Sequence, residues 1–394
     1  MAKAKPQCSG KSQYLCGKRV LPEPISETTD IVQLIDNMDA YNGGRLRAAC
    51  QLLRDKYSPE DVTIGLSLAG ALTPAGLGPA AIIPLMNHGF VDWLVATGAN
   101  MYHDLHFAFN LPMHRGSHTV NDTDLRDKGV TRIYDILFDY QDVLMETDRR
   151  LRQILVRPEF QKEMGTREFY YRLGKILDEH ERKNGIGQVS VLAAAYRNGI
   201  PVFTSSPGDS TIGMNVAGLE LLAEAEGLQD RFKLKINPSI DVNDSTAIIL
   251  NAKKYEKGKT AVILIGGGSP KNFMLQTEPQ IQEVLMIPEA GQDYDINVTD
   301  ARPDTGGLSG APPSEAVSWG KIDPARLEET VTAYLDVTAA FPMMVAYCLR
   351  TTRPKKLKRL YDRGQELHER LMKSYLENNR EVEALRKLIK KVNA

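Results

Sequence analysis

The stretch TAVILIGGG, residues 260–268, decides the fold class of this chain. Its first part is an unbroken apolar run, and such a run is typical of a strand in a parallel sheet covered on both faces. Three glycines follow, and their lack of a Cβ lets the backbone turn sharply and approach a ligand. The stretch therefore predicts a buried strand that ends in a glycine turn, followed by a helix that begins near Pro270.

The same strand-then-helix rhythm runs through most of the chain. Alternating strands and helices predict an α/β fold with a doubly wound, mostly parallel sheet. Residues 100–186 interrupt the rhythm with a loop and charged helices. Further strands are expected at residues 62–68, 91–98, 200–206, 232–236, 294–299 and 331–337, and helices at residues 31–56, 78–89, 190–199, 215–227, 243–258 and 339–349.

Three regions are expected along the sequence. Residues 1–56 form an N-terminal arm and helices, residues 57–350 the α/β domain, and residues 351–394 a charged C-terminal helical extension. In the extension, Leu and Met recur at helical spacing among mixed charges. That pattern fits a solvated helix packed along one stripe as well as it fits a subunit contact.

The composition is that of a soluble globular protein. Of the 394 residues, 42% are hydrophobic and 25% charged, and the net charge of −1 gives no case for nucleic-acid binding. The four cysteines are too few and too scattered for a disulfide framework, which favours a cytoplasmic location. The weakly charged stretch 63–99 contains prolines, many glycines and Asp92, so no membrane span is expected.

The segment EAVSWGKI, residues 315–322, places Lys321 directly after a Trp-Gly pair. An amine becomes nucleophilic at neutral pH when burial lowers its pKa. Trp319 can supply an apolar wall for such a lysine, and Glu315 can orient an amine substrate. A solvated loop lysine is the alternative, and the spacing alone leaves both interpretations open.

Other strand ends carry candidate ligand-binding residues. The glycine turn at residues 266–268 precedes a helix whose N-terminus favours an anion, although a tight turn without a ligand fits equally well. Asp209 and Asp336 each follow a strand. A carboxylate at such a place can hold ribose hydroxyls or can simply cap a helix.

A cluster of histidines lies in residues 102–118. Histidine and aspartate are metal ligands, but these histidines share no clear helix face, and a loop is expected after Leu105. Hydrogen-bonding histidines are therefore favoured, and no metal is expected. The residues are His103, His106, His114 and His118, with Asp104 among them.

Together these motifs resemble those of the deoxyhypusine synthase family, and of a divergent branch within it. The resemblance covers roughly residues 60–345. It implies a Rossmann-like fold, NAD as cofactor and a homotetramer with sites between paired subunits. It rests most on EAVSWGKI and extends to LRDKGVTRIYDILF (125–138), IPVFTSSPGDSTIG (200–213), AVILIGGGSPKN (261–272) and YLDVTAAFPMMVA (334–346).

The resemblance also implies a reaction and a set of residues. NAD oxidises a polyamine such as spermidine, Lys321 takes the aminobutyl group as a covalent imine, and a second amine accepts that group before the bound NADH reduces the product. The acceptor in the family is a protein lysine or, in homospermidine synthases, putrescine. The family's substrate positions correspond to Glu315, Trp319, Ser309 and Asn272, and its cofactor positions to Thr97, Asp209, Gly267, Gly268, Thr299 and Asp336.

Several positions depart from the family pattern. Two acidic residues that grip the spermidine amines appear here as Met214 and Leu308, and a histidine of the substrate site appears as Asn272. Because an unpaired buried dication is costly, these changes predict a changed amine substrate. Smaller departures are Gln276 for an asparagine and Tyr102–His103 for an acidic pair, with Asn215 or Asp304 as partial substitutes for the lost carboxylates.

Three classes of function follow from these residues. The leading one is an NAD-dependent aminoalkyl transferase with changed amine specificity, including homospermidine-type synthesis. A non-catalytic NAD- or polyamine-binding regulatory paralogue is favoured by the lost acidic residues and disfavoured by the retained Glu315, Trp319 and Lys321. A metal-dependent amine hydrolase built on the histidine segment is the third.

Overall fold

The computed structural model describes residues 15, 17, 19–21, 23–377 and 381–392. Its centre is a six-stranded sheet in the order β11–β10–β9–β1–β2–β7, and every neighbouring pair of strands is parallel. This is the strand order of the Rossmann fold, and it reverses direction between β1 and β9. The strands are β1 (Val62–Leu68), β2 (Trp93–Ala96), β7 (Val202–Phe203), β9 (Lys259–Ile265), β10 (Tyr294–Val298) and β11 (Thr330–Ala333).

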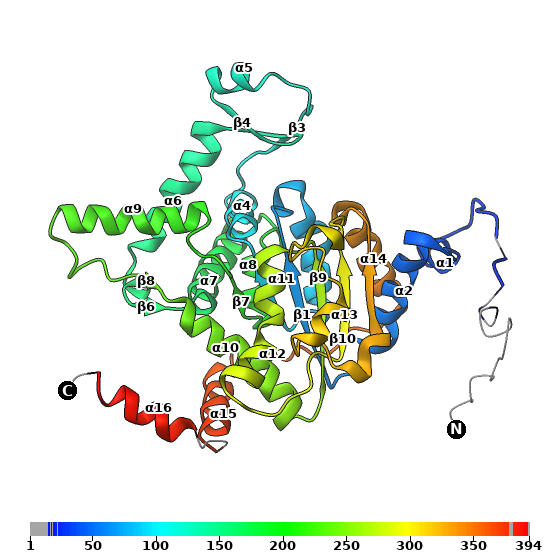
Figure 1. Cartoon of the computed structure of the whole chain (residues 1–394). Helices are drawn as coiled ribbons and strands as arrows, with labels where there is room; N and C mark the ends of the chain where they lie inside the picture. Colours follow the sequence, from blue (N-terminus) through cyan, green and yellow to red (C-terminus); the bar gives the residue numbers. More distant parts are fainter. Residues whose placement is uncertain (1–14, 16, 18, 22, 378–380, 393–394) are drawn as a thin grey trace.

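The predicted α/β class with a parallel, doubly wound sheet is confirmed. Successive residues of β9 point to opposite faces, so Val262 and Leu264 enter one hydrophobic cluster and Ile263 and Ile265 enter another. Both faces of the sheet are covered (Figure 1). One cluster includes α10 (Pro238–Leu250), α11 (Gly268–Leu275) and α15 (Gly364–Glu377), and the other includes α2 (Tyr41–Lys56), α3 (Ile83–Asn87), α8 (Val191–Asn198) and α14 (Val337–Thr351).

The strand expected at residues 232–236 is largely wrong. Only Lys235–Ile236 (β8) is a strand, and it pairs with β6 (Glu163–Met164) in a separate two-stranded sheet. Of these five residues only Leu234 is buried, and the lysines on either side of it, Lys233 and Lys235, are exposed. Alternating lysines therefore keep this segment at the surface and away from the central sheet.

Residues 100–186 contain more regular structure than the loop and charged helices that were expected. Helix α4 (Gly98–Ala108) leads into an antiparallel sheet of β3 (His114–Arg115), β5 (Ile136–Asp139) and β4 (Val130–Ile133), which with α5 (Asp122–Asp127) projects from the body as an arm (Figure 1). The chain returns through α6 (Glu146–Leu155) and α7 (Thr166–Asn184), and α9 (Thr211–Ala225) follows β7.

The C-terminal extension is a helical pair rather than one long helix. Residues 354–363 are not helical, α15 then packs Leu367 and Leu371 against α10, and α16 (Glu381–Ile389) ends the described chain. For α15, the interpretation of a helix packed along one stripe is confirmed. At the other end, α1 (Ile31–Asp36) and α2 account for the helices predicted within residues 31–56.

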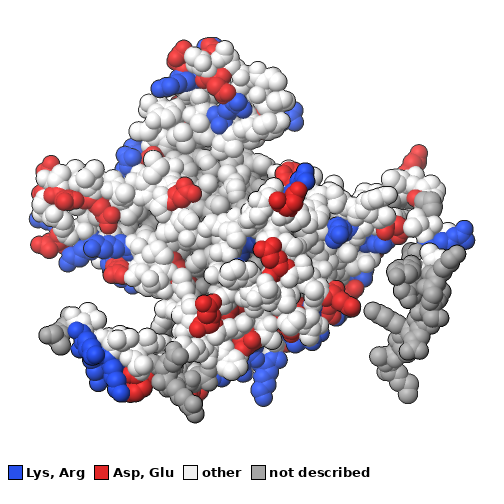
Figure 2. Space-filling model, in the orientation of Figure 1, with Lys and Arg blue, Asp and Glu red and all other residues white. Residues whose placement is uncertain are grey.

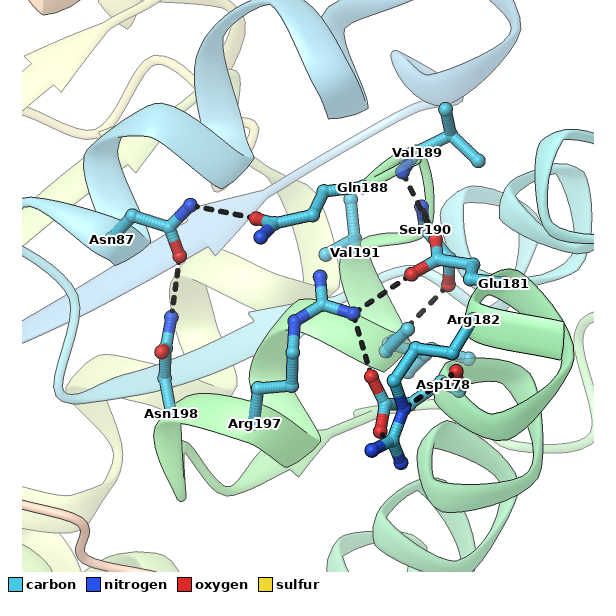
Figure 3. Close-up of polar contacts among 12 residues, drawn as sticks. Asn87, Asp178, Glu181, Arg182, Gln188, Val189, Ser190, Val191, Arg197 and Asn198 are labelled. Atoms are coloured by element: carbon cyan, nitrogen blue, oxygen red, sulfur yellow. Dashed lines mark hydrogen bonds and ion pairs between the residues drawn. The ribbon is translucent and has the colours of Figure 1, made fainter. Parts of the chain in front are cut away.

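Buried ion pairs hold α7 against α8 (Figure 3). Arg197 donates from Nη1 to Asp178 Oδ1 at 2.9 Å and to Glu181 Oε2 at 2.8 Å. The second carboxylate oxygen of Glu181 accepts from the backbone N–H groups of residues 189 and 190, at the start of α8. Since both carboxylates are buried and paired, removing one partner would leave an uncompensated charge.

Asp104 ties α4 to the same corner. Its carboxylate accepts from Ser190 Oγ at 2.6 Å and from the backbone of residues 191 and 192. Burial raises the pKa of Asp104 to about 6, against the effect of these hydrogen bonds. The contact fixes α4, whose first turn lies at the carboxyl end of β2.

The surface carries both signs of charge. On the face drawn in Figure 2, lysines and arginines are interspersed with aspartates and glutamates, and much of the centre carries neither. Within the part of the chain that the structure describes, no helix is long and apolar enough to cross a membrane.

Candidate functional site

The predicted cofactor residues all follow the carboxyl ends of the central strands. Thr97 follows β2, Gly267 and Gly268 follow β9, and Thr299 follows β10. Asp209 lies beyond β7, and Asp336 beyond β11. Because neighbouring strands are parallel, these ends meet at one edge of the sheet, where α/β proteins of this strand order bind nucleotides.

Close backbone contacts join the loops at this edge. A Cβ on Gly267 would lie 2.3 Å from Ser309 Cα, and a Cβ on Gly98 would lie 2.4 Å from Ser210 Cβ. Ser269 Oγ donates to Ser205 Oγ at 2.8 Å and links the loops that follow β9 and β7. Glycine is therefore required at Gly267 and Gly98 for the loops to pack, whether or not it also leaves room for a ligand.

Asp336 and Asp209 differ in whether they cap a helix, which was the alternative to binding a ribose. Asp336 Oδ1 accepts from Thr338 N at 2.9 Å and from Ala339 N at 3.2 Å, so the cap interpretation is confirmed for this residue. For Asp209 it is wrong, because Ser210 caps α9 and the Asp209 side chain is exposed. Thr97 caps α4 and accepts from Asn100 N.

Beside this edge lies a cavity of about 320 Å³ that contains Lys321. The glycine turn after β9, helix α11 and helix α13 (Pro313–Ser318) bring its walls together. Four of the predicted site residues, Lys321, Glu315, Trp319 and Asn272, line it. The remaining lining residues are Lys271, Leu275, Gln276, Leu308, Ala311 and Ala316.

Lys321 is held at both its backbone and its amine. Its backbone N–H donates to Ala316 O, and its carbonyl accepts from Gln292 N, both at 3.0 Å. Its Nζ donates to Asn272 Oδ1 at 2.9 Å and lies 5.9 Å from the Trp319 ring centroid. Burial lowers the pKa of Lys321, while the nearby Glu315 carboxylate opposes this shift. These contacts favour a positioned amine over a freely solvated one.

One chain alone leaves the cavity around Lys321 partly open to solvent. Trp319 is 64% exposed, and Lys321 is only partly buried. The cause is the position of α13, a short helix whose six residues are all at least partly exposed. Trp319 ends that helix and therefore covers only one side of the cavity.

The positions that depart from the family pattern divide into two groups. Leu308 and Gln276 line the cavity beside Asn272, so these departures change its walls directly. Met214 lies on α9, is 67% exposed and is not among the lining residues. Ser309, a predicted substrate residue, is not among the lining residues either, and its Oγ accepts from Gly268 N at 2.9 Å.

Neither proposed substitute for the lost carboxylates reaches the cavity. Asn215 is buried, donates to Asp148 Oδ1 and accepts from Arg152 Nε. Asp304 pairs with Arg302 within its own loop. Glu315 is consequently the one carboxylate among the lining residues that the structure describes.

Lys271 is a cavity residue that was not selected as a candidate from the sequence. It lies on α11 and is 6% exposed, with its Nζ donating to Ala311 O at 2.8 Å. Its place just after the glycine turn and just before Asn272 was the available signal. A buried lysine next to a candidate ligand residue is unusual enough to mark a site.

The histidine segment is helical further than predicted. Helix α4 continues to Ala108, so the loop expected after Leu105 is wrong for residues 106–108. His103 Nδ1 and His106 Nε2 are 3.0 Å apart, and His106 Nδ1 is 2.8 Å from Thr147 Oγ1. Burial lowers the pKa of His103 to about 4 and that of His106 to about 3.

His103 and His106 thus form a hydrogen-bonded pair in which His106 is buried and His103 half-buried. His114 and His118 lie in the exposed arm. Among residues 15, 17, 19–21, 23–377 and 381–392, no group of three or more His, Cys, Asp or Glu side chains could hold a metal ion. A metal-dependent hydrolase built on this segment has no support from the geometry.

Comparison with known proteins explains the arrangement. The family model described as deoxyhypusine synthase matches residues 30–348. The chain belongs to the deoxyhypusine synthase family. This is a family of NAD-dependent aminobutyl transferases, and the recognition of a divergent member from the sequence is confirmed.

Relatives of the deoxyhypusine synthase family align over most of the chain. The "Deoxyhypusine synthase-like protein" of Nostoc sp. is 52% identical over 361 residues, which are 91% of this chain and 92% of that protein. The "Probable deoxyhypusine synthase 2" of Methanosarcina acetivorans is 36% identical over 81% of this chain and 86% of its own length.

A solved structure from Entamoeba histolytica, of a protein proposed to be a deoxyhypusine synthase, superimposes with a TM-score of 0.51. The superposition covers 84% of this chain and 98% of that one. At 12% identity this likeness concerns the fold alone.

Proposed function

We propose that this chain is an NAD-dependent aminoalkyl transferase that acts on a polyamine through a covalent imine on Lys321. The observation that carries the proposal is the placement of the Lys321 amine, which donates to Asn272 inside a cavity shared with Glu315 and Trp319. A lysine attacks a carbon–nitrogen double bond only when its amine is neutral. Burial moves the pKa of Lys321 in that direction.

The other walls of the cavity suit an aliphatic amine. Glu315 supplies one carboxylate for an ammonium group, and the exposed Trp319 ring can stack against a cationic chain. Leu275, Leu308 and an alanine wall offer apolar surface to the methylenes between the nitrogens. A volume of about 320 Å³ suits a molecule of this size.

The sheet edge beside the cavity fits a dinucleotide. The Rossmann strand order and the glycine turn after β9, where an added Cβ at Gly268 would meet no atom within 4 Å, are the features that support NAD there. Thr97, Asp209, Thr299 and Asp336 would hold the cofactor with Gly267 and Gly268. When bound, NAD supplies the hydride acceptor for the donor amine and returns the hydride to the product.

We further propose that the amine specificity differs from that of deoxyhypusine synthase. Leu308, Asn272 and Gln276 put neutral side chains around a cavity in which Glu315 is the one carboxylate among the described lining residues. Because these departures from the family pattern lie in the cavity wall itself, we propose a small amine such as putrescine as the acceptor in place of an extended protein segment. Homospermidine-type synthesis is the corresponding product class. The named family reaction, with a protein lysine as acceptor, is the contrasting outcome of the test.

A homotetramer with sites between paired subunits is part of the proposal. The exposed Trp319 and the partly buried Lys321 support it, because a second subunit over α13 would exclude water from the amine. Water exclusion would strengthen the effect of burial on the Lys321 pKa.

The test is imine trapping with borohydride. The protein is mixed with NAD and spermidine, putrescine, agmatine or homospermidine, then reduced, and the modified peptide is identified by mass spectrometry. The expected result is an adduct on Lys321 that requires NAD and whose mass identifies the transferred group. Lys321→Met is the negative control, and Lys128→Met, an exposed lysine of the arm, is the matched control.

A regulatory paralogue that binds NAD or a polyamine without turnover is the second candidate. It is favoured by the neutral side chains at Leu308, Asn272 and Gln276, which leave the cavity with few proton-transferring groups. NAD binding by calorimetry without an adduct from any of the amines would support this candidate and would remove the transferase proposal.

A further inference from the structure

A second cavity, of about 500 Å³, lies beside the cavity that contains Lys321. Its walls come from α10, the end of α11, α12 (Thr277–Pro279) and the π-helical segment η7 (Gln280–Val284), which contact one another (Figure 1). Asn272 and Gln276 line both cavities. The two cavities therefore adjoin at the end of α11.

The hydroxyl groups of the second cavity offer oxygen lone pairs rather than protons. Ser245 and Thr246 both donate to Val242 O, at 3.1 and 2.7 Å. Thr277 Oγ1 donates to Met274 O at 2.8 Å. Because a hydroxyl has one proton and two lone pairs, each of these three groups is left only as an acceptor. A lining of acceptors suits a ligand that donates hydrogen bonds, such as an ammonium group.

The charge of the second cavity is opposite to that of the first. Among the described residues that line it, Glu283 is the one charged residue. Its carboxylate is exposed and forms no hydrogen bond or ion pair with another residue that the structure describes. The first cavity instead contains two lysines and one carboxylate. Because like charges repel, a cationic amine is better accommodated in the second cavity.

The apolar lining of the second cavity suits the aliphatic part of such an amine. Val242 from α10, Phe273 from α11 and Val284 from η7 belong to this lining. Val284 is 53% exposed and Phe273 is half-buried, so both have surface that a ligand can cover. One carboxylate, acceptor hydroxyls and apolar side chains together fit a short aliphatic diamine.

We propose that the second cavity binds the acceptor amine of the transfer reaction, with Glu283 pairing the ammonium group that is farther from Lys321. The inference rests on the proposed function for the reaction that it serves. Lys321 Nζ donates to Asn272 Oδ1 at 2.9 Å, and Asn272 lines both cavities, so an acceptor bound beyond Asn272 lies next to the nucleophile. One nitrogen of a diamine stays protonated at Glu283, while the other, neutral, reaches the imine.

The transfer step between the two amines balances without a further reagent. The neutral nitrogen of the acceptor adds to the imine carbon held by Lys321, and a proton passes from that nitrogen to the Lys321 nitrogen. The bond between the carbon and Lys321 Nζ then breaks. Lys321 leaves as a free amine, and the acceptor carries the group as a new imine, which the hydride of the proposed reaction reduces.

The experiment maps where a diamine binds and does not require turnover. The full-length protein is irradiated with a putrescine analogue that carries a diazirine on one methylene, and the labelled segments are identified by mass spectrometry. Residues 242–246 and 277–284 contribute to the second cavity only, and residues 308–321 to the first only. The expected result is labelling within 242–246 or 277–284 that an excess of putrescine prevents.

Two variants test the charge of the second cavity. Glu283→Gln removes the carboxylate, so the half-saturating concentration of the analogue should rise about fivefold, as expected for the loss of one exposed ion pair. Val284→Arg adds a positive charge and should raise it at least as much. The matched controls, Glu179→Gln on α7 and Val156→Arg, should match the unmodified protein. Glu179 is exposed, Val156 is 53% exposed like Val284, and neither control residue lines either cavity.

Labelling of residues 308–321 alone would overturn the proposal. So would labelling of the second cavity that neither Glu283→Gln nor Val284→Arg weakens. The proposed function fails separately. Labelling of the second cavity in a protein that traps no adduct on Lys321 would support the diamine site and remove the transferase. An adduct on Lys321 in a protein whose second cavity is never labelled would keep the transferase and remove the acceptor site.

Discussion

Replacing Gly267 with alanine should separate the glycine turn from the loop that carries Ser309. The added Cβ would lie 2.3 Å from Ser309 Cα and 2.5 Å from Ser309 Cβ and Oγ. Carbon atoms in contact normally lie about 3.5–4.0 Å apart, so one of the two segments must move by more than ~1 Å. The nearest atom belongs to the backbone, and a rotamer change therefore cannot relieve the clash.

The free-energy cost follows from the contacts that this movement strains or breaks. Inserting a methyl group into a close contact costs about 1–3 kcal/mol. The hydrogen bond from Gly268 N to Ser309 Oγ, 2.9 Å long, would be lost as well, at about 1 kcal/mol. The free energy of unfolding should therefore fall by about 2–4 kcal/mol. NAD affinity should fall at least ~10-fold, because the cofactor edge is rearranged.

The matched control is Gly306→Ala in the same loop. Gly306 has a φ of +70° and no atom within 4 Å of an added Cβ, so alanine there brings backbone strain without a clash. Strain of this kind costs about 1 kcal/mol. Urea unfolding and calorimetric titration with NAD compare the two variants. If Gly267→Ala is as stable as Gly306→Ala and binds NAD like the unmodified protein, the close contact does not hold this edge together.

Three further predictions concern pH, charge and capping. Since burial lowers the pKa values of His103 to about 4 and His106 to about 3, the unfolded state takes up protons first as the pH falls below the unfolded value of about 6.5. The free energy of unfolding should therefore fall between pH 6.5 and 4, and His103 alone should account for up to about 3 kcal/mol of this loss. In the double variant His103→Gln/His106→Gln, the free energy of unfolding measured with urea should depend less on pH. Leu308→Glu places a second carboxylate at the cavity and should tighten spermidine binding roughly 5–10-fold in calorimetry, whereas Leu385→Glu on α16 should leave it unchanged; equal affinities would place the amine elsewhere. Asp336→Asn retains a capping side chain and should unfold within about 0.5 kcal/mol of the unmodified protein, while its NAD affinity falls; loss of stability without loss of NAD affinity would make Asp336 a cap alone.

The sequence predicted the strands that are buried on both faces and failed on those that are not. Residues 62–68 and 260–265 are uncharged and mostly apolar, which suits strands that lie between two neighbouring strands and under two helical layers. The arm at residues 114–139 has a sheet whose residues are mostly exposed or half-buried, so no run of apolar residues marks it. The predicted end of helix α4 at Leu105 is too early because His106, although polar, lies in the core. Its hydrogen-bond partner, Thr147, is 41 residues away in the sequence.

The candidate site shows the same division. The sequence predicted which residues come together, because parallel strands bring their carboxyl ends to one edge of the sheet. Lys321 also shares one segment with Glu315 and Trp319. The solvent exposure of these residues could not be predicted, because the exposure of Trp319 depends on where α13 lies in the folded chain. The roles of Asn215 and Asp304 were equally out of reach, since each is decided by a partner in the folded chain.

The charges around the cavity connect the nucleophile to the choice of substrate. The lining residues include two lysines and one carboxylate, which is an unfavourable environment for a cationic amine if both lysines are protonated. The Lys271 amine donates to Ala311 O, which leaves Lys321 and Glu315 as the charged groups that can face a ligand. If Lys321 is neutral, Glu315 is free to pair with one ammonium group, and the cavity accepts a cation. Under the proposed function, the neutral amine needed for nucleophilic attack is therefore also the condition for binding the substrate, and a cationic amine that enters the cavity would further disfavour a charge on Lys321.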